Sequence, residues 1–287
     1  MKKFMLFIFA LLVSVSISAQ KGKVGTSISL VGQITPETLA QIKNAGIDYI
    51  EVTMNNFVRK QPENEVYTKA YKALKDIKDA GLKVWSVHLP YSSAWDISII
   101  DPVKRAEVVA FFEEMIRLAE IFEPECLVLH PGADTIKDDD TRADRLKCAR
   151  NSIGRLALMA KEIGAVLCIE DLPRTCPGRT ADEIDYLTAD IPNVKICFDT
   201  NHLLIDTHED FFQKVGDRIG TIHVSDYDRV DEKHWLPLSG RGVIDWPAFC
   251  KNLKACGYEG VFMFESRGEG VTAEDVVRVY DQMKKFR

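Results

Sequence analysis

Carboxylate and imidazole side chains stand at the ends of short hydrophobic runs in this chain, where mostly apolar residues would be expected. In chain order they are Glu51, His88, His130, Glu170, Asp199, His202, His223 and Glu265. Carboxylate oxygens and imidazole nitrogens are common ligands of divalent metal ions, and a pair of glutamates can also move a substrate proton. These residue types indicate a metal centre with acid–base chemistry, provided that the fold brings the run ends together.

The hydrophobic runs alternate with longer amphipathic segments. The predicted strands are 24–29, 47–53, 82–88, 126–130, 165–170, 194–199, 219–224 and 260–265. They are almost continuously apolar, as expected for strands of a parallel sheet covered by helices. Helical periodicity is clearest at 102–121, 141–163 and 272–284, and several helices end at a glycine just before the next strand.

Eight alternating units predict an α/β protein, a (β/α)8 TIM barrel with a single domain over residues 21–287. An open doubly wound sheet is the alternative, but no glycine-rich phosphate-binding fingerprint follows the first strand. In such a barrel the carboxyl ends of the strands meet at one mouth, where the active site lies. The run-end residues would therefore converge there.

Several carboxylates in one barrel mouth would repel one another without a cation. Three carboxylates and one imidazole suit Mn²⁺, Co²⁺ or Mg²⁺, and Zn²⁺ is also compatible. The predicted metal ligands are Glu170, Asp199, His223 and Glu265. His88 and His130 are predicted to be functional, whereas for Glu51 a structural and a functional role stay equally open.

The first twenty residues have the pattern of a signal peptide. Lys2 and Lys3 precede an apolar run over 4–13, and small and polar residues follow up to Ala19 and Gln20. We therefore expect a secreted or periplasmic protein without a membrane anchor. Cleavage removes two lysines, so the formal charge of −6 becomes more negative by two. An acidic chain without a basic run is poorly suited to nucleic acid, which favours a small-molecule substrate.

The cysteines give no sign of redox or nucleophilic chemistry. There are seven, none in a C-x-x-C pair, and their odd number and irregular spacing define no disulfide framework. Cys168 and Cys197 lie inside predicted strands, where cysteine acts as a small hydrophobic residue. One bridge remains open in an oxidising compartment, whereas a catalytic thiol is not indicated.

Six motifs carry a resemblance to a known family. They are LHPG at 129–132, IEDLPR at 169–174, FDTNH at 198–202, HVSDYD at 223–228, HWLPLSGRG at 234–242 and FES at 264–266. Each is weak alone, but each stands at or just beyond the end of a predicted strand, and their order makes the signal strong. Over essentially the whole mature chain, the sequence resembles the xylose isomerase-like TIM-barrel superfamily. That superfamily contains sugar isomerases and epimerases, inosose dehydratases and endonuclease IV enzymes.

The resemblance to the epimerase branch implies roles for these residues. It implies that Glu170, Asp199, His223 and Glu265 hold one metal ion, and that the two glutamates flank the substrate and exchange its proton. It also implies substrate binding by His202. We predict further substrate contacts from His88, His130, His234 and Arg267. Arg241, Trp95 and Trp235 are open candidates, because exposed arginines and packed aromatic residues in loops are often structural.

The predicted activity is that of a divalent-metal-dependent sugar isomerase or epimerase, acting on a keto- or aldo-sugar through an enediolate. One of Glu170 and Glu265 would remove the proton beside the carbonyl, and the other would return it. The same enediolate could expel a group at the β position. The enzyme would then be a lyase or dehydratase of keto-sugars or keto-glycosides, and the motifs do not separate these activities.

Two further classes remain as alternatives. Endonuclease IV enzymes hold three zinc ions, and the extra histidines of this chain could fill part of such a cluster. However, the chain has Asp231-Glu-Lys-His234 where that branch has Asp-x-His, and its acidic charge and expected export disfavour DNA. A barrel that only binds a ligand is the second of these alternatives.

Overall fold

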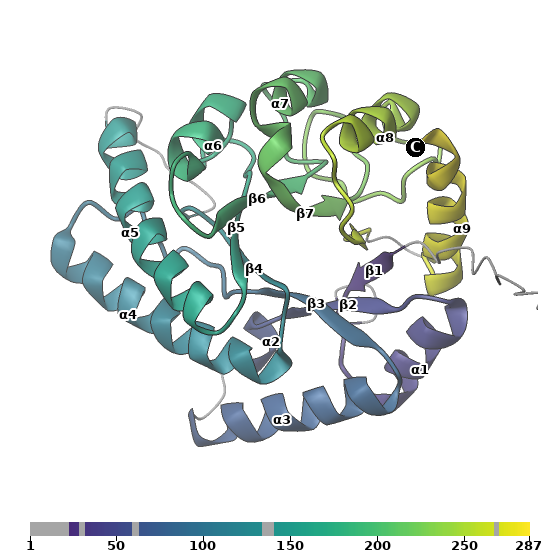
Figure 1. Cartoon of the computed structure of the whole chain (residues 1–287), viewed down its shortest axis with the longest axis horizontal. Coiled ribbons are helices and arrows are strands. Elements are labelled where there is room, and N and C mark those ends of the chain that lie inside the picture. The colour runs from purple at the N-terminus through teal and green to yellow at the C-terminus, as the bar shows by residue number, and fades with distance from the viewer. Residues whose placement is uncertain (1–22, 29–31, 59–62, 134–140, 267–269) are drawn as a thin grey trace, which may run out of the picture.

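A closed barrel of parallel strands forms the centre of the computed structural model, and helices surround it (Figure 1). The structure describes residues 23–28, 32–58, 63–133, 141–266 and 270–287, so the expected signal peptide over 1–20 lies outside the described residues. The strands follow one another around the barrel in chain order, and the last pairs with the first. The predicted single-domain (β/α)8 TIM barrel is confirmed.

The strands match the predicted hydrophobic runs. They are β1 (Val24–Ser27), β2 (Tyr49–Thr53), β3 (Lys83–His88), β4 (Cys126–Leu129), β5 (Val166–Glu170), β6 (Val194–Asp199), β7 (Ile219–Val224) and β8 (Phe262–Phe264). The strands β6 and β7 have the predicted bounds, and the others are shorter by one or two residues at one or both ends. The carboxylates and histidines predicted at the run ends therefore lie within three residues of the carboxyl end of a strand.

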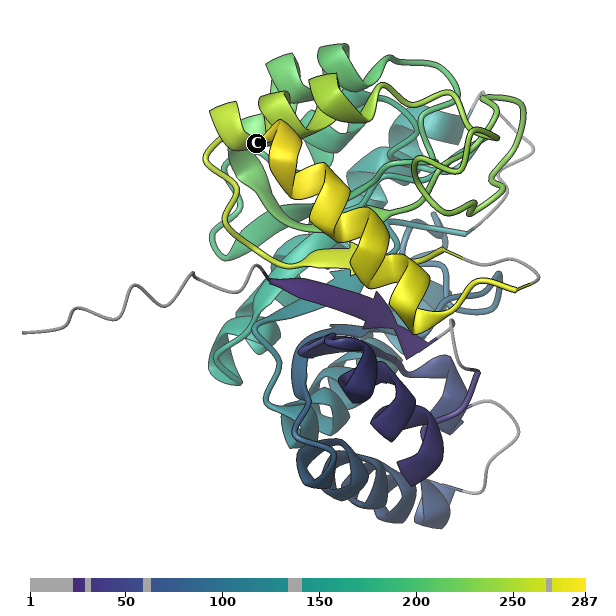
Figure 2. The same cartoon turned by 90° about the vertical axis from the view of Figure 1, so that its right-hand side faces the viewer.

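The helices form a ring outside the barrel. They are α1 (Pro36–Ala45), α2 (Asn55–Val58), α3 (Glu63–Asp79), α4 (Pro102–Ala119), α5 (Arg142–Glu162), α6 (Ala181–Thr188), α7 (His208–Val215), α8 (Trp246–Ala255) and α9 (Ala273–Met283). The last helix, α9, packs across β1 and closes the ring between α8 and α1 (Figures 1 and 2). Within the described ranges, the helices are too short or too polar to cross a bilayer.

The two faces of each strand pack against different partners. Leu127, Leu129, Ile169 and Phe198 belong to the large core between the strands and the helices. The alternate residues of the same strands form a separate buried cluster inside the barrel, made of Cys126, Val128, Cys168 and Cys197. Side chains alternate along a strand, so residues two positions further on continue the inner row. His130, Glu170 and Asp199 are therefore directed into the barrel mouth.

The turn that follows β5 is fixed by a partly buried ion pair at the start of α6. Thr180 caps α6 by accepting the Glu183 N–H at 3.3 Å. The Glu183 side chain does not return to the Thr180 N–H, because it pairs with the Arg142 guanidinium at 2.5 and 2.6 Å and accepts the Gly178 N–H at 3.0 Å. Arg142 also donates to the carbonyls of Thr175 and Cys176. The network anchors the segment that overhangs the barrel mouth.

His208 begins α7 and is packed against the rings of Phe198, Tyr227 and Phe249. Its Nε2–H donates to the Thr200 carbonyl at 2.7 Å. Burial lowers the pKa of His208 from its ordinary value of 6.5 to about 4. The unfolded chain therefore takes up this proton at a higher pH than the folded protein does.

This difference predicts an acid-sensitive fold. Stability should fall as the pH drops from about 6.5 towards 4, and His208 should account for up to about 3 kcal/mol of the loss. His208→Gln keeps a donor for the Thr200 carbonyl but cannot titrate. We expect its free energy of unfolding, measured with urea at pH 7 and pH 4.5, to fall less than that of the wild type. Equal losses in both proteins would contradict the assignment.

Candidate metal centre

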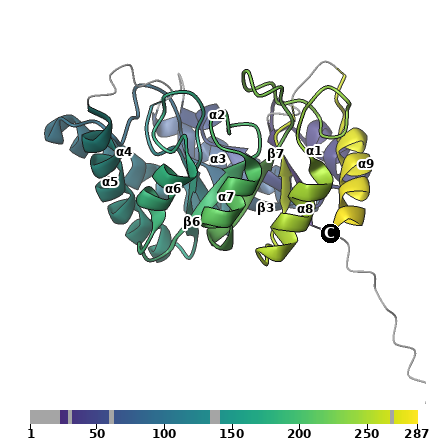
Figure 3. The same cartoon turned by 90° about the horizontal axis from the view of Figure 1, so that it is seen from above.

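The predicted ligands converge at the mouth formed by the carboxyl ends of the strands. Glu170 and Asp199 end β5 and β6, His223 is the last residue but one of β7, and Glu265 directly follows β8. All four side chains are buried, with residue exposures between 0% and 7%. The long loop 225–245 after β7 rises above this rim of the barrel (Figure 3). The structure brings these four side chains together at one end of the barrel.

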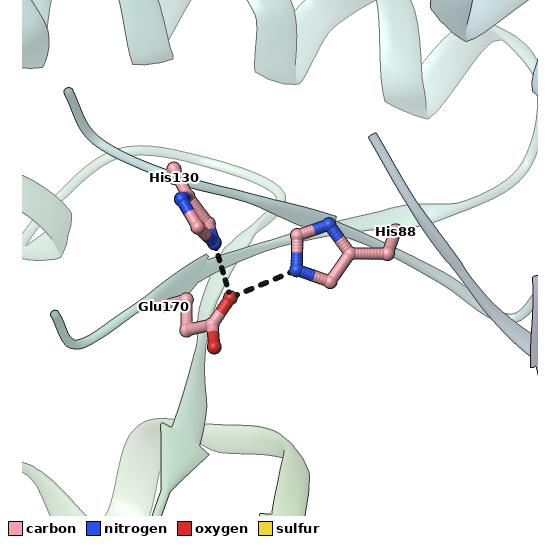
Figure 4. A group of neighbouring side chains, drawn as sticks. All are labelled: His88, His130 and Glu170. Carbon is pink, nitrogen blue, oxygen red and sulfur yellow. Dashed lines mark hydrogen bonds and ion pairs between the residues drawn. The ribbon is translucent and has the colours of Figure 1, made fainter. Parts of the chain in front are cut away.

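Glu170 is the centre of the cluster. Its Oε2 lies 3.1 Å from the Nε2 atoms of both His88 and His130, which point to it from neighbouring strands (Figure 4). Its Oε1 lies 3.2 Å from His223 Nδ1 and 3.7 Å from His202 Nδ1. Burial acts to raise the pKa of Glu170, but the surrounding histidines outweigh it and hold this pKa well below its ordinary value. Glu170 is therefore a carboxylate ion.

His223 presents one ring nitrogen to three carboxylates. Its Nδ1 lies 3.2, 3.7 and 3.8 Å from carboxylate oxygens of Glu170, Asp199 and Glu265. Four ligand atoms placed tetrahedrally at about 2.1 Å from one metal ion are about 3.4 Å apart. The distances from His223 Nδ1 to the three carboxylates are therefore close to the ligand spacing around one divalent ion.

Hydrogen bonds on the far side of each ring support the same assignment. His223 Nε2 lies 3.0 Å from Glu51 Oε2, and the Nδ1 atoms of His88 and His202 lie 2.9 and 2.8 Å from backbone carbonyls. A carbonyl only accepts, so His88 and His202 donate there and turn the other nitrogen towards Glu170 and Asp199, respectively. A neutral imidazole and a carboxylate that face each other in this way need a cation or a proton between them.

Buried carboxylate oxygens without a hydrogen-bond partner are also consistent with a cation site. Asp199 Oδ2 and Glu51 Oε1 are buried and have no hydrogen-bond partner among the described residues. Burial acts to lower the pKa of His223, but the neighbouring Cys197 and the carboxylates of Glu51, Glu265 and Glu170 outweigh it and raise this pKa well above its ordinary value. A proton on His223 therefore balances part of the negative charge, and a divalent ion would release it on binding.

The donor atoms offer more than one position for an ion. The ligand atoms of His88, His130 and Glu170 lie within 4.8 Å of one another, and so do those of Glu170, Asp199 and His202. Glu170 belongs to both groups through its two oxygens. The centre therefore contains the four ligands predicted for one ion and an adjacent pair of histidines that could bind a second ion or a substrate.

Glu51, which the sequence left open, belongs to this centre. It is fully buried on β2, and its Oε2 accepts the Ser86 hydroxyl at 2.7 Å as well as contacting His223. Burial raises the pKa of Glu51, but His223 outweighs this effect and holds the pKa below its ordinary value. Glu51 therefore fixes the ring orientation of His223 through Nε2, the ring nitrogen opposite the one that faces the other carboxylates.

Asp171 and Asp226 support the site from outside it. Asp171 accepts the Asp199 N–H at 2.7 Å, and burial together with the charge of Asp199 raises its pKa well above the ordinary value. Asp226 accepts the Trp246 indole N–H at 2.8 Å and so joins the loop after β7 to α8.

All seven cysteines fall within the described ranges and are free thiols.

A cavity of about 170 Å³, with room for roughly six water molecules, opens above the cluster. It is lined by His88, Tyr91, His130, Glu170, Leu172, Pro173, Arg174, His202, Glu232, His234 and Glu265. Four of the predicted substrate-binding residues, all histidines, therefore line it, whereas Arg267 lies outside the described residues.

The sequence did not indicate some of the residues that line the cavity. Some of the substrate-binding candidates that it left open lie away from the cavity. Tyr91 stacks on His130 at 4.9 Å between ring centroids, and only its position after the His-Leu-Pro strand end hinted at the site. Trp95 instead stacks on Phe111 of α4 at 5.0 Å, which is a structural role. Arg241 and Trp235 are not among the residues that line the cavity.

Comparison with known proteins agrees with the fold and the motifs. Residues 39–284 match the family model described as xylose isomerase-like TIM barrel. A ketose 3-epimerase from Arthrobacter globiformis is 31% identical over 206 residues, which are 68% of this chain and 67% of that protein. A D-tagatose 3-epimerase-like protein has a similar fold, with a TM-score of 0.74 and 20% identity over 92% of this chain and 96% of its own. The IolI protein, solved with a bound zinc atom, has a TM-score of 0.73 and 17% identity, covering 91% of this chain and 96% of its own.

Proposed function

The chain belongs to the xylose isomerase-like TIM barrel family, and from this we propose that it is a divalent-metal-dependent sugar epimerase or isomerase. One observation carries the proposal. Three histidines are fixed by hydrogen bonds on one ring nitrogen and turn the other towards buried carboxylates, directly below a cavity of monosaccharide size. The ketose 3-epimerase relative supports a sugar as the substrate class.

The proposed metal ligands are Glu170, Asp199, His223 and Glu265, holding Mn²⁺, Co²⁺, Mg²⁺ or Zn²⁺. When bound, the ion would supply positive charge beside the oxygens of the enediolate. Asp199 and His223 lie fully buried beneath the cavity and can serve only as ligands or supports. Glu170 and Glu265 line the cavity and so can also reach a substrate.

Glu170 and Glu265 are the proposed acid–base pair. They stand at the carboxyl ends of β5 and β8 and both line the cavity, so a sugar bound there can contact both carboxylates. One carboxylate takes the proton from the carbon beside the carbonyl, and the other returns a proton to the opposite face. His88, His130, His202 and His234 line the cavity and would orient hydroxyl groups, with Arg267 as a further proposed contact.

The remaining proposals concern the compartment and the partners. We propose that residues 1–20 direct export to the periplasm or the medium, where free sugars and keto-glycosides are more available than sugar phosphates. The negative formal charge of the chain supports a small carbohydrate over nucleic acid as the partner.

Proton exchange with solvent tests this function. Metal-loaded protein, incubated in D₂O with a panel of ketoses and keto-glycosides, should place deuterium on the carbon beside the carbonyl and form the epimer or isomer. NMR detects the exchange, and mass spectrometry in H₂O separates epimerisation, which conserves mass, from elimination, which releases water or an aglycone. The metal salt without protein is the control. Absence of exchange with every sugar and metal ion would refute the proposal.

A further inference from the structure

Two oppositely charged side chains meet at the wall of the cavity. Arg174 follows β5 and Glu232 lies in the loop after β7, and both line the cavity above the metal centre. The Arg174 Nη1–H donates to Glu232 Oε2 at 2.7 Å. The pair joins two loops that are 58 residues apart in the chain. It therefore forms part of the wall against which a substrate rests.

Each side chain extends from an anchored backbone. Arg142 holds the carbonyls of Thr175 and Cys176 directly after Arg174. The other loop is held by a backbone pair between Asp226 and Trp235, with N–H···O distances of 2.7 and 2.8 Å. The fold of both loops therefore holds the ion pair in the wall of the cavity.

The pair has hydrogen-bonding capacity that the described residues do not use. Glu232 Oε1 is buried and has no partner among them, although Oε2 is bound to Arg174. The Glu232 side chain is 15% exposed. A buried carboxylate oxygen without a donor is costly unless a ligand supplies one. A hydroxyl group is the donor that a sugar in this cavity can offer.

The charge balance of the pair also selects the ligand. An unpaired arginine would attract a phosphate or carboxylate group. Here Glu232 neutralises Arg174, so the negative charges of Glu170 and Glu265 in the same cavity disfavour an anionic end group. We propose that Arg174 and Glu232 form a distal subsite that binds the hydroxyl groups of a neutral sugar, away from the metal-bound carbons, and rejects phosphorylated sugars. This inference rests on the proposed function.

The test compares substrates with and without distal hydroxyl groups. In metal-loaded protein, Glu232→Gln should raise the KM for a ketohexose about 10- to 100-fold with little change in kcat. It should leave proton exchange of dihydroxyacetone, which has no distal hydroxyl groups, unchanged. The same variant removes the negative charge beside Arg174 and should improve kcat/KM for a ketohexose phosphate, whereas Glu232→Asp should restore part of the original preference.

Glu113→Gln is the matched control, because Glu113 pairs with Arg155 on the outer helices with similar exposure but away from the cavity. An unchanged ketohexose KM in both Glu232→Gln and Arg174→Ala would overturn the subsite. If the wild type turns over no ketose, the proposed function fails, and the subsite is then tested by sugar binding alone. A sugar-induced rise in Tm that is lost in these variants would then support the subsite, and no rise with any neutral sugar would refute it.

Discussion

Glu170→Gln should lower kcat by about 10²- to 10⁴-fold, the range that loss of a catalytic acid–base group produces. The substitution removes the negative charge that His88, His130 and His223 share, and it also removes the base. Glutamine keeps the shape of the side chain, so the barrel should stay intact. Initial rates of epimer formation, with circular dichroism and Tm as checks on folding, measure the effect.

The variant set around Glu170 separates chemistry from folding. Glu113→Gln removes an equivalent charge from the outer face of α4 and should keep full activity. Glu170→Asp keeps the charge but retracts it, and should retain more metal than Glu170→Gln while still losing most turnover. A folded Glu170→Gln protein with wild-type activity would contradict the proposed acid–base role.

Removal of divalent metal is expected to abolish turnover and to lower the Tm. A ligand at 100 times its Kd stabilises the folded state by about 2.7 kcal/mol, which is several degrees for a chain of this size. Dialysis against a chelator, followed by activity and Tm measurements with Mn²⁺, Co²⁺, Mg²⁺ and Zn²⁺, tests this. Activity that survives in protein shown to be free of metal would contradict the metal-dependent mechanism.

The metal content of the purified protein separates the remaining classes. One equivalent supports the epimerase-like centre, and a second would occupy the group of His88, His130 and Glu170. Three zinc ions would favour the endonuclease-like alternative. As a second probe, Glu51→Gln leaves the ligands in place but weakens the support of His223, and it should raise the metal Kd about 10- to 100-fold. Competition with a chromogenic chelator measures this Kd without reference to turnover.

The barrel, and the convergence of the proposed ligand residues at its mouth, were predictable because both follow from local patterns. Eight apolar runs define eight strands, and parallel strands bring their carboxyl ends to one edge. Alternation along each strand then decides which residues enter the mouth, so Glu170 and Asp199 follow from their own strands. The convergence of these residues needed no knowledge of the loops.

The cavity wall could not be predicted in the same way. Arg174 and His234 have φ values of 58° and 52°, a left-handed backbone that residues other than glycine rarely adopt. The partner of Arg174 lies 58 residues away along the chain. The Glu183 side chain pairs with Arg142 instead of the nearby backbone N–H of Thr180. Such choices depend on tertiary contacts, which is why Tyr91, Arg174 and Glu232 were missed.

The separation of ligands from wall residues has a consequence for protein engineering. The side chains proposed to bind the ion are positioned by strands whose packing supports the whole barrel, whereas Arg174 and Glu232 belong to loops on its surface. Loop exchange between relatives could therefore retune which sugar is accepted while the reactive centre stays intact. A library confined to residues 172–175 and 229–236 would search substrate preference at small risk to folding.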